Sequence, residues 1–264
     1  MSARLRLALS HFVGWLADRR IPGFLRGPVF RTYARFTGAD LTEARPPLEA
    51  YPSLSAFFVR RLVDGAREIS RDPEVFTSPV DGTVQAIDRV HEGSLIQAKG
   101  QLYGVRGLLA GLGQDVALDG GYGWTVYLSP RDYHRIHAPE DCRLLHVHWI
   151  PGDRHSVRPK VLEKRSVFAI NERCALEFES ERGRFFLILV GALNVGRIRV
   201  VGVDPQQRDL NRPKDFQRGE ELARFEMGST IILITPPGTA SPFEDMEPGM
   251  PLRLGQPLGK WSAT

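Results

Sequence analysis

The sequence predicts a mostly β protein of the α+β class, in which N-terminal amphipathic helices precede a β-barrel or sandwich. Three observations support this prediction. The 264 residues include 26 glycines and 19 prolines, about 17% of the chain against roughly 12% on average, which indicates many turns. Short apolar or alternating runs follow one another from about residue 75 onward. Apolar residues at helical spacing come before those runs.

The overall composition is that of a chain that can fold around a core. Apolar residues make up 42% and charged residues 25% of the chain, so the composition does not indicate disorder. The two cysteines, Cys142 and Cys174, form no CxxC motif. We therefore expect neither a disulfide framework nor a cysteine-rich zinc module, and a reducing compartment is compatible with the sequence.

Positive charge is concentrated at the N-terminus. Residues 1–36 hold seven arginines and one aspartate, a net charge of +6, whereas the whole chain carries +4. The other 228 residues therefore sum to about −2. This distribution favours a local anionic partner over general nucleic-acid binding.

Helices are expected at three places near the N-terminus. Apolar residues recur at helical spacing from Leu5 to Leu16, a second helix is expected over Phe24–Phe36, and a short third helix runs from near Ser53 to Val59. Aromatic and arginine side chains on the first two helices suit a membrane interface. Amphipathic helices that pack on the protein body would show the same pattern, so both interpretations stay open.

No transmembrane helix is expected at the N-terminus. The uncharged run Leu7–Ala17 has 11 residues, whereas a span needs roughly 20. A secretory signal peptide is the alternative, with MSARLR as its basic segment and the same run as its apolar segment. The charged residues Asp18, Arg19 and Arg20 follow at once, and no small-x-small cleavage site ends the run, which argues against a signal peptide.

Nine short strands are expected in the rest of the chain. They cover residues 83–90, 94–98, 124–129, 143–150, 175–179, 185–190, 198–203, 230–235 and 252–258. Glycine, proline and aspartate separate these runs, as they do between strands. Because no long helix is expected between them, the strands favour a barrel or sandwich over a parallel α/β fold.

Two histidines three residues apart are candidate acid–base groups. His134 and His137 follow an expected strand, and imidazole is the side chain best suited to proton transfer near neutral pH. His146 and His148 on the next expected strand, together with Cys142, make a zinc site an alternative. No HExxH motif or standard zinc spacing is present, however. Structural histidines with hydrogen-bonded rings are the third interpretation.

Asp81 and Ser229 could complete a set of reacting groups. Asp81 lies in a Pro-x-Asp-Gly turn, where it either forms the turn or supplies a carboxylate that orients a histidine. Gly228 precedes Ser229, and a Gly-Ser pair at the start of a strand is ordinary at a bend. The same pair leaves the Gly228 carbonyl open to attack by the Ser229 hydroxyl once a base removes its proton. Asp, His and Ser are also the parts of a hydrolase triad.

Eight segments of the chain carry a family resemblance. They are Phe57–Arg60, Pro79–Gly82, Ile96–Gly100, Leu128–Pro139, Pro151–Asp153, Asn171–Arg173, Val190–Ala192 and Arg224–Thr230. Together they resemble the phosphatidylserine decarboxylases, which are pyruvoyl-dependent enzymes of phospholipid synthesis. The Tyr-His segment and the later Gly-Ser-Thr are the most specific part of this resemblance.

The resemblance implies a proenzyme that cuts itself. Ser229 would attack the Gly228 carbonyl, with His137 as the base and Asp81 orienting His137. Elimination and hydrolysis would leave a β chain of residues 1–228 and an α chain of residues 229–264 that begins with a pyruvoyl group made from Ser229. The pyruvoyl ketone would form a Schiff base with the amine of phosphatidylserine and withdraw electrons as carbon dioxide leaves. His134 would then supply the proton that completes phosphatidylethanolamine.

The resemblance also implies the organisation and surroundings of the protein. A helical membrane-association region, residues 1–62, would precede a barrel-sandwich-like catalytic domain, residues 63–264, and a homodimer is possible. The expected partners are a phospholipid substrate and an anionic membrane surface on the cytoplasmic side of the cell membrane, without nucleic acid. Neither a metal nor pyridoxal phosphate is expected, since Lys99 is the only one of five lysines in a family-matching segment.

Three other functions stay open at this point. The first is a related pyruvoyl-dependent decarboxylase that acts on another amino-acid headgroup or on a free amino acid. The second is a Ser/His/Asp hydrolase, which would keep an intact chain. The third is a non-catalytic β carrier or scaffold.

Overall fold

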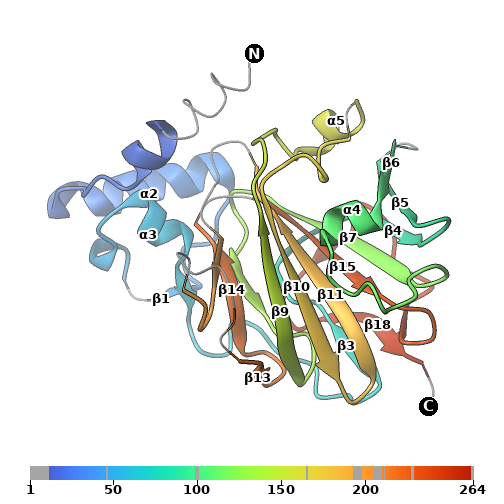
Figure 1. The fold of residues 1–264 in the computed structure, drawn as a ribbon. Helices are drawn as coiled ribbons and strands as arrows, with labels where there is room; N and C mark the ends of the chain where they lie inside the picture. The colour runs from blue at the N-terminus through green and yellow to red at the C-terminus, as the bar shows by residue number, and fades with distance from the viewer. Residues whose placement is uncertain are drawn as a thin grey trace.

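Most of the chain folds into short β strands that follow a few helices (Figure 1). The structure is a computed structural model, and it describes residues 12–45, 47–98, 101–164, 166–192, 198–204, 210, 212–226 and 229–262. Its helices are α2 (Gly23–Thr37), the 3-10 helix η1 (Leu48–Ala50), α3 (Leu54–Phe58), α4 (Val105–Leu109) and α5 (Pro159–Leu162), and residues 12–17 are also helical. Its strands are β1 (Ala44–Arg45), β2 (Arg61–Leu62), β3 (Val75–Thr77), β4 (Gly82–Arg89), β5 (Ser94–Ala98), β6 (Gln101–Gly104), β7 (Tyr122–Leu128), β8 (Arg135–His137), β9 (Cys142–Ile150), β10 (Arg173–Ser180), β11 (Gly183–Val190), β12 (Ile198–Val200), β13 (Lys214–Phe216), β14 (Glu221–Phe225), β15 (Ser229–Thr235), β16 (Ala240–Pro242), β17 (Pro251–Leu252) and β18 (Pro257–Trp261). The mostly β, α+β class is confirmed.

An antiparallel sheet of eight strands forms the centre of the β body. Its strand order is β13-β9-β10-β11-β15-β7-β4-β17. β15 lies between β11 and β7, and its residues 231–234 are fully buried because both faces of the sheet are covered. Since β13 and β17 are the two edges, the sheet is open, and the sandwich rather than the barrel describes it.

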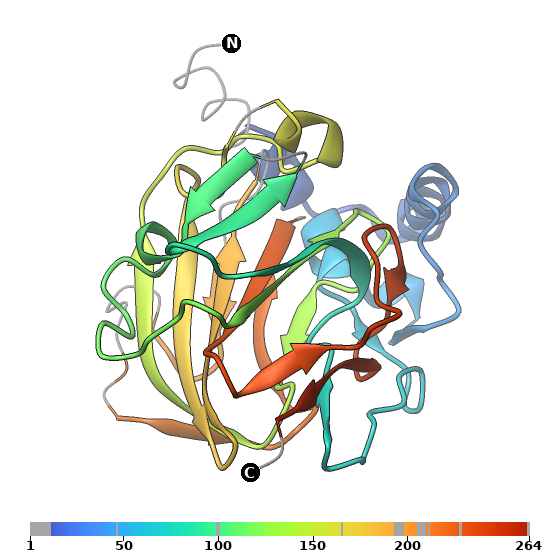
Figure 2. The same ribbon diagram turned by 90° about the vertical axis from the view of Figure 1, so that its right-hand side faces the viewer.

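Different elements cover the two faces of this sheet. On one face lie the three-stranded sheets β12-β14-β8 and β16-β18-β3, which enclose a core with Phe76, Trp124 and Phe185. On the other face, α4 and the β5–β6 hairpin enclose a second core with Leu108 and Phe186. Figure 2 shows the β5–β6 hairpin in green beside the sheet, with the helices α2 and α3 on the opposite side of the molecule.

The N-terminal helices pack against one another through a small aromatic cluster, and Tyr33 of α2 joins them to the β body by donating to the Pro130 carbonyl over 2.6 Å. The cluster consists of Phe30 from α2, Tyr51 from the segment between η1 and α3, and Phe57 from α3. The ring centroids of Phe30 and Phe57 lie 4.8 Å apart. α3 begins where expected, because the Ser53 side chain accepts a hydrogen bond from the Ala56 N–H. The second and third expected helices are therefore confirmed. The first expected helix begins within residues 1–11, which lie outside the described residues.

The expected strands are observed with two changes. The run 252–258 is divided between β17 and β18 by a turn in which Gly255 has a φ of 84°, and a Cβ there would lie 2.7 Å from the Glu68 carbonyl oxygen. The run 198–203 is shorter, because β12 ends at Val200 and Gly202 follows with a φ of 79°. The pattern did not indicate β8 or β14, which carry few residues and no clear alternation.

Candidate active site

The short sheet β12-β14-β8 places the candidate histidines along β14, the strand that precedes β15. β8 pairs with β14, so that His137 lies opposite Glu221, and the Phe225 N–H donates to the His134 carbonyl over 3.0 Å. Four residues after Phe225, Ser229 begins β15, with its backbone opposite Leu128. The connection between these strands therefore starts beside His134. Gly228, the expected cleavage residue, lies outside the described residues, and of Ser229 the structure describes the backbone.

His134 is fully buried, and one of its two ring nitrogens has no hydrogen-bond partner among the described residues. Its Nδ1 donates to the Asp132 carbonyl over 2.8 Å, because a carbonyl can only accept. Its Nε2 therefore holds a lone pair, and this atom is buried without a partner in the part of the chain that the structure describes. Burial and the nearby Arg60 charge lower the pKa of His134 to about 3, against the backbone hydrogen bond, which raises it. The ring lies 4.0 Å from the Phe58 ring.

His137 has both ring nitrogens engaged. Its Nδ1 donates to the Gly219 carbonyl over 2.8 Å, and its Nε2 accepts from the Tyr133 hydroxyl over 3.0 Å. The ring is therefore fixed in the tautomer whose basic atom is Nε2. Burial lowers the pKa of His137, and the Glu221 charge opposes that effect.

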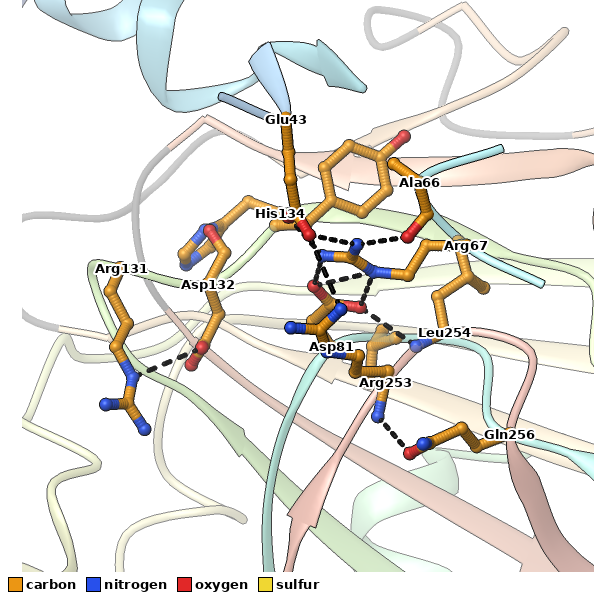
Figure 3. Close-up of polar contacts among 12 residues, drawn as sticks. Glu43, Ala66, Arg67, Asp81, Arg131, Asp132, His134, Arg253, Leu254 and Gln256 are labelled. Atoms are coloured by element: carbon orange, nitrogen blue, oxygen red, sulfur yellow. Dashed lines mark hydrogen bonds and ion pairs between the residues drawn. The ribbon is translucent and has the colours of Figure 1, made fainter. Parts of the chain in front are cut away.

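Asp81 is held by an arginine and a backbone amide (Figure 3). Arg67 donates from Nε over 2.9 Å and from Nη2 over 2.5 Å to the Asp81 carboxylate, and the Leu254 N–H donates to the same group over 2.9 Å. Arg67 also pairs with Glu43 over 2.8 Å. Burial alone would lower the pKa of Arg67, but the hydrogen bonds to both carboxylates outweigh burial and raise it.

These contacts correct the expected contact between Asp81 and His137. Asp81 acts on His137 through its charge, which raises the pKa of the histidine, and the hydrogen bonds to the ring come from Tyr133 and Gly219 instead. The physical reason is that the buried Arg67 guanidinium lies directly against the carboxylate, so that Asp81 pairs with it. The carbonyl of Gly219 thus fixes the tautomer, the role that the sequence had assigned to Asp81.

The other histidines lie apart from this site. His146 and His148 are exposed on β9, and His148 Nδ1 donates to the Ala110 carbonyl over 3.2 Å. Among the described residues, no group of three or more His, Cys, Asp and Glu side chains gathers as metal ligands would. The zinc interpretation of this histidine cluster therefore has no geometric support.

A cavity of about 680 Å³ is lined by residues of α2, β4, β7, the segment after β7 and the start of α5. Phe36, Tyr127, Ser129, Arg131 and Arg158 are among the residues that line it. In the sheet, residue 127 pairs with residue 230, the position that follows Ser229. Tyr127 is therefore the lining residue that joins this cavity to the strand that carries the expected cleavage position.

The family model for phosphatidylserine decarboxylase matches residues 54–260 of this chain. The chain belongs to the phosphatidylserine decarboxylase family. The match covers α3, both candidate histidines, Asp81 and Ser229, whereas Glu43 and Phe36 lie before it.

Named relatives span almost the full chain. The phosphatidylserine decarboxylase proenzyme of Anaeromyxobacter sp. (strain K) is 38% identical over 264 aligned residues, which cover 96% of this chain and 93% of the relative. The proenzyme of Halorhodospira halophila is 39% identical over 256 residues, 93% of this chain and 87% of the relative. That of Aliivibrio salmonicida is 37% identical over 269 residues, 95% of this chain and 93% of the relative.

The pyruvoyl group that the family resemblance implies would begin β15, and the residues around that position fit it. His134 Nε2 and Thr230 Oγ1 are buried polar atoms without partners among the described residues. A small carbonyl group with a bound substrate could supply such partners. No local sequence signal singles out Gly219 or Arg67 as contacts of this site, whereas Tyr133 lies in the Tyr-His segment that carries the family resemblance.

Proposed function

We propose that this chain is a self-cleaving proenzyme whose mature form decarboxylates phosphatidylserine to phosphatidylethanolamine. The proenzyme names of the relatives support this proposal. The observation that supports it in the structure is the β8–β14 pairing, in which the His134 carbonyl accepts from Phe225 four positions before Ser229, while His137 lies opposite Glu221, eight positions before Ser229. The two expected proton-transfer groups thus lie along the strand that leads into the expected cleavage position.

The first reaction would cut the chain before Ser229. When the Tyr133 hydroxyl gives up its hydrogen bond to His137 Nε2, that atom takes the proton of the Ser229 hydroxyl. The serine oxygen attacks the Gly228 carbonyl and displaces the amide nitrogen to give an ester. Loss of the Ser229 α-proton then expels the Gly228 carboxylate as the end of the β chain. One water enters and ammonia leaves as residue 229 becomes the pyruvoyl end of the α chain, so the atoms balance.

The second reaction would be decarboxylation by the mature protein. The pyruvoyl group supplies an electron sink for the bond between the substrate α-carbon and its carboxylate. His134 Nε2 holds a lone pair and takes a proton from the substrate ammonium. The same atom returns a proton to the carbon that has lost its carboxylate. The enclosed position of His134 excludes water that would compete for this proton.

Intact-mass analysis of the purified protein tests this proposal. We expect two chains, residues 1–228 and residues 229–264, the smaller one blocked at its N-terminus by a ketone. A Ser229→Ala variant is expected to stay one polypeptide and to release no carbon dioxide from phosphatidylserine. An intact wild-type chain that is acylated at Ser229 by a fluorophosphonate would instead support a serine hydrolase.

We also propose that the N-terminal helices place the protein on the cytoplasmic face of the cell membrane. The outer side of α2 exposes 81% of Phe24 and 85% of Phe36, and the preceding helical residues Phe12 and Trp15 are more than half exposed. Arg35 lies in the last turn of α2. Such apolar side chains with arginines suit the boundary between headgroups and acyl chains. Within the described residues, no helix is long and apolar enough to cross a membrane.

A vesicle flotation assay tests the membrane proposal. A Phe24→Ser/Phe36→Ser variant should bind phosphatidylserine-containing vesicles at least about tenfold more weakly, because it removes exposed apolar area without touching Phe30 in the aromatic cluster. Ile170→Ser is the control, since Ile170 is half exposed elsewhere on the surface. Equal binding by both variants would refute the membrane role of α2. The homodimer stays a prediction, which sedimentation of the mature protein would check.

A further inference from the structure

Arg60, the second residue after α3, is a buried cation with most of its hydrogen-bonding capacity unused. Its residue exposure is 3%, and its Nη2 donates to the Arg131 carbonyl over 3.0 Å. Its Nε and Nη1 are buried without partners in the described part of the chain. The guanidinium carbon lies 5.2 Å from the centroid of the Phe57 ring. Apart from one carbonyl, this cation therefore faces mostly apolar surroundings.

No carboxylate in the described ranges forms an ion pair with Arg60. Its neighbour Arg67 differs, because two carboxylates, Glu43 and Asp81, bind that guanidinium directly. Burial lowers the pKa of Arg60, and more distant groups, Tyr33 first among them, partly oppose that effect. A buried charge without a counter-ion destabilises a fold strongly. Such a residue in a folded protein indicates that an anion from outside completes the site.

The position of Arg60 identifies which anion this would be. Its charge is close enough to His134 to contribute to the lowered pKa of that histidine. The Arg131 carbonyl that Arg60 binds belongs to the segment 129–131, which lines the cavity between α2 and β7. An anionic group bound to Arg60 would thus lie next to His134, with the rest of the ligand directed toward the cavity.

We propose that Arg60 binds an oxyanion of the substrate headgroup, either the carboxylate or the phosphodiester. This inference rests on the proposed function for the identity of the ligand. Binding would give the buried guanidinium the charged acceptor that it lacks, and charge-assisted hydrogen bonds of this kind are stronger than neutral ones. Arg60 would fix the headgroup relative to His134 Nε2, the atom that exchanges protons with the substrate. It is a substrate-binding residue in this scheme.

Binding of short-chain lipids to the Ser229→Ala precursor tests this proposal, because that protein needs neither cleavage nor turnover. The ligands are dihexanoyl phosphatidylserine and dihexanoyl phosphatidylethanolamine, each below its micelle concentration, measured by calorimetry. Arg60→Gln should weaken phosphatidylserine binding at least about tenfold, which corresponds to about 1.4 kcal/mol. If Arg60 binds the carboxylate, phosphatidylethanolamine binding stays unchanged. If Arg60 binds the phosphodiester, both lipids bind more weakly.

Two controls keep this test decisive. Arg143→Gln removes an arginine that is paired with Asp215 on the surface of β9, and it should bind both lipids as the parent does. Arg60→Lys keeps the charge if Arg60→Gln fails to fold, and it should retain part of the affinity. Equal affinities for Arg60→Gln and Arg143→Gln would overturn the proposal, as would a parent precursor that binds neither lipid. An uncut wild-type chain would overturn the proposed function but would leave the binding result intact.

Discussion

The surroundings of His134 and those of His137 differ although the two residues lie three positions apart. Both rings donate from Nδ1 to a backbone carbonyl, Asp132 in one case and Gly219 in the other, so both have Nε2 as the basic atom. Only His137 has a donor on that atom, the Tyr133 hydroxyl. His134 keeps Nε2 buried with no partner in the described residues, beside a cation.

This difference predicts that one segment serves two reactions. A ring held at both nitrogens has its orientation set before any ligand arrives, which suits a base that acts within the chain. A buried ring whose basic nitrogen has no hydrogen-bond donor among the described residues suits a group that exchanges protons with a bound substrate. The division of roles between His137 and His134 is a prediction of this comparison.

Replacing each histidine by alanine tests the comparison most strongly. His137→Ala should slow self-cleavage at least about 100-fold, which is the usual contribution of a general base. His134→Ala should cut itself within a few-fold of the normal rate but lose carbon dioxide release by a similar factor. Intact mass over time measures the first reaction, and release of labelled carbon dioxide measures the second.

The exposed His148 provides the control for both variants, since His148→Ala should leave both reactions unchanged. The comparison would fail if His134→Ala blocked self-cleavage as completely as His137→Ala.

Asp81→Asn tests whether Asp81 mainly supports self-cleavage by His137 or mainly stabilises the fold through its ion pair with Arg67. Because both side chains of the pair are less than one-tenth exposed, breaking it should lower the free energy of unfolding by about 3 kcal/mol. Self-cleavage of the folded protein should fall less than in His137→Ala. Denaturant unfolding of the Ser229→Ala precursor measures the first effect. Asp64→Asn, in an exposed pair with Arg45, should change stability by less than about 1 kcal/mol.

The opposite result would support a role of Asp81 in the function of His137. That result is unchanged stability in Asp81→Asn together with a loss of self-cleavage equal to that of His137→Ala.

The hydroxyl of Tyr133 distinguishes His137 from His134, and Tyr133→Phe removes it. A donor to Nε2 stabilises the neutral ring, so its loss should raise the pKa of His137. One neutral hydrogen bond contributes about 1 kcal/mol, or roughly 0.7 pH units. The acid limb of the self-cleavage rate should therefore move to higher pH by about that amount. Tyr122→Phe is the matched control on β7, and an equal shift in both variants would exclude this role for Tyr133.

The pH dependence of the free energy of unfolding is where we expect the smallest difference between His134 and His137. His134 has a pKa of about 3 when folded and an ordinary value near 6.5 when unfolded. Between these values the unfolded chain binds the extra proton, so stability falls as the pH falls, by up to about 1.4 kcal/mol per pH unit. In the Ser229→Ala background, His134→Leu should flatten this slope between pH 6 and 4.5 more than His137→Leu does. Equal slopes in thermal unfolding would contradict the stronger burial of His134.

Local patterns predicted much of the fold. Ser53 marked the start of α3, and the apolar run 230–235 marked the central strand β15, because such signals depend on neighbouring residues. β8 and β14 are too short to show a period, and they form strands because they pair with each other. The division of 252–258 into two strands depends on the close approach of Gly255 to the Glu68 carbonyl, which no local pattern records.

The sequence singled out the residues of the candidate site but did not predict the contacts among them. His134, His137 and Ser229 were singled out by spacing and by the family resemblance. The partner of Asp81 was not, because Arg67 lies 14 positions earlier and has no special local pattern. The carbonyl of Gly219, 82 positions from His137, is also supplied by the three-dimensional fold alone. That no carboxylate of the described ranges pairs with Arg60 is visible only in the three-dimensional structure.

The central place of β15 has a consequence for the protein after it is cut. The fragment that begins at residue 229 contributes β15 between β11 and β7, β17 at the edge beside β4, and β18 beside β3. Its removal would open the middle of the large sheet and expose two apolar layers to water. The two pieces should therefore stay interlocked without any covalent link, and once separated by denaturant they should reassemble at a rate that depends on protein concentration.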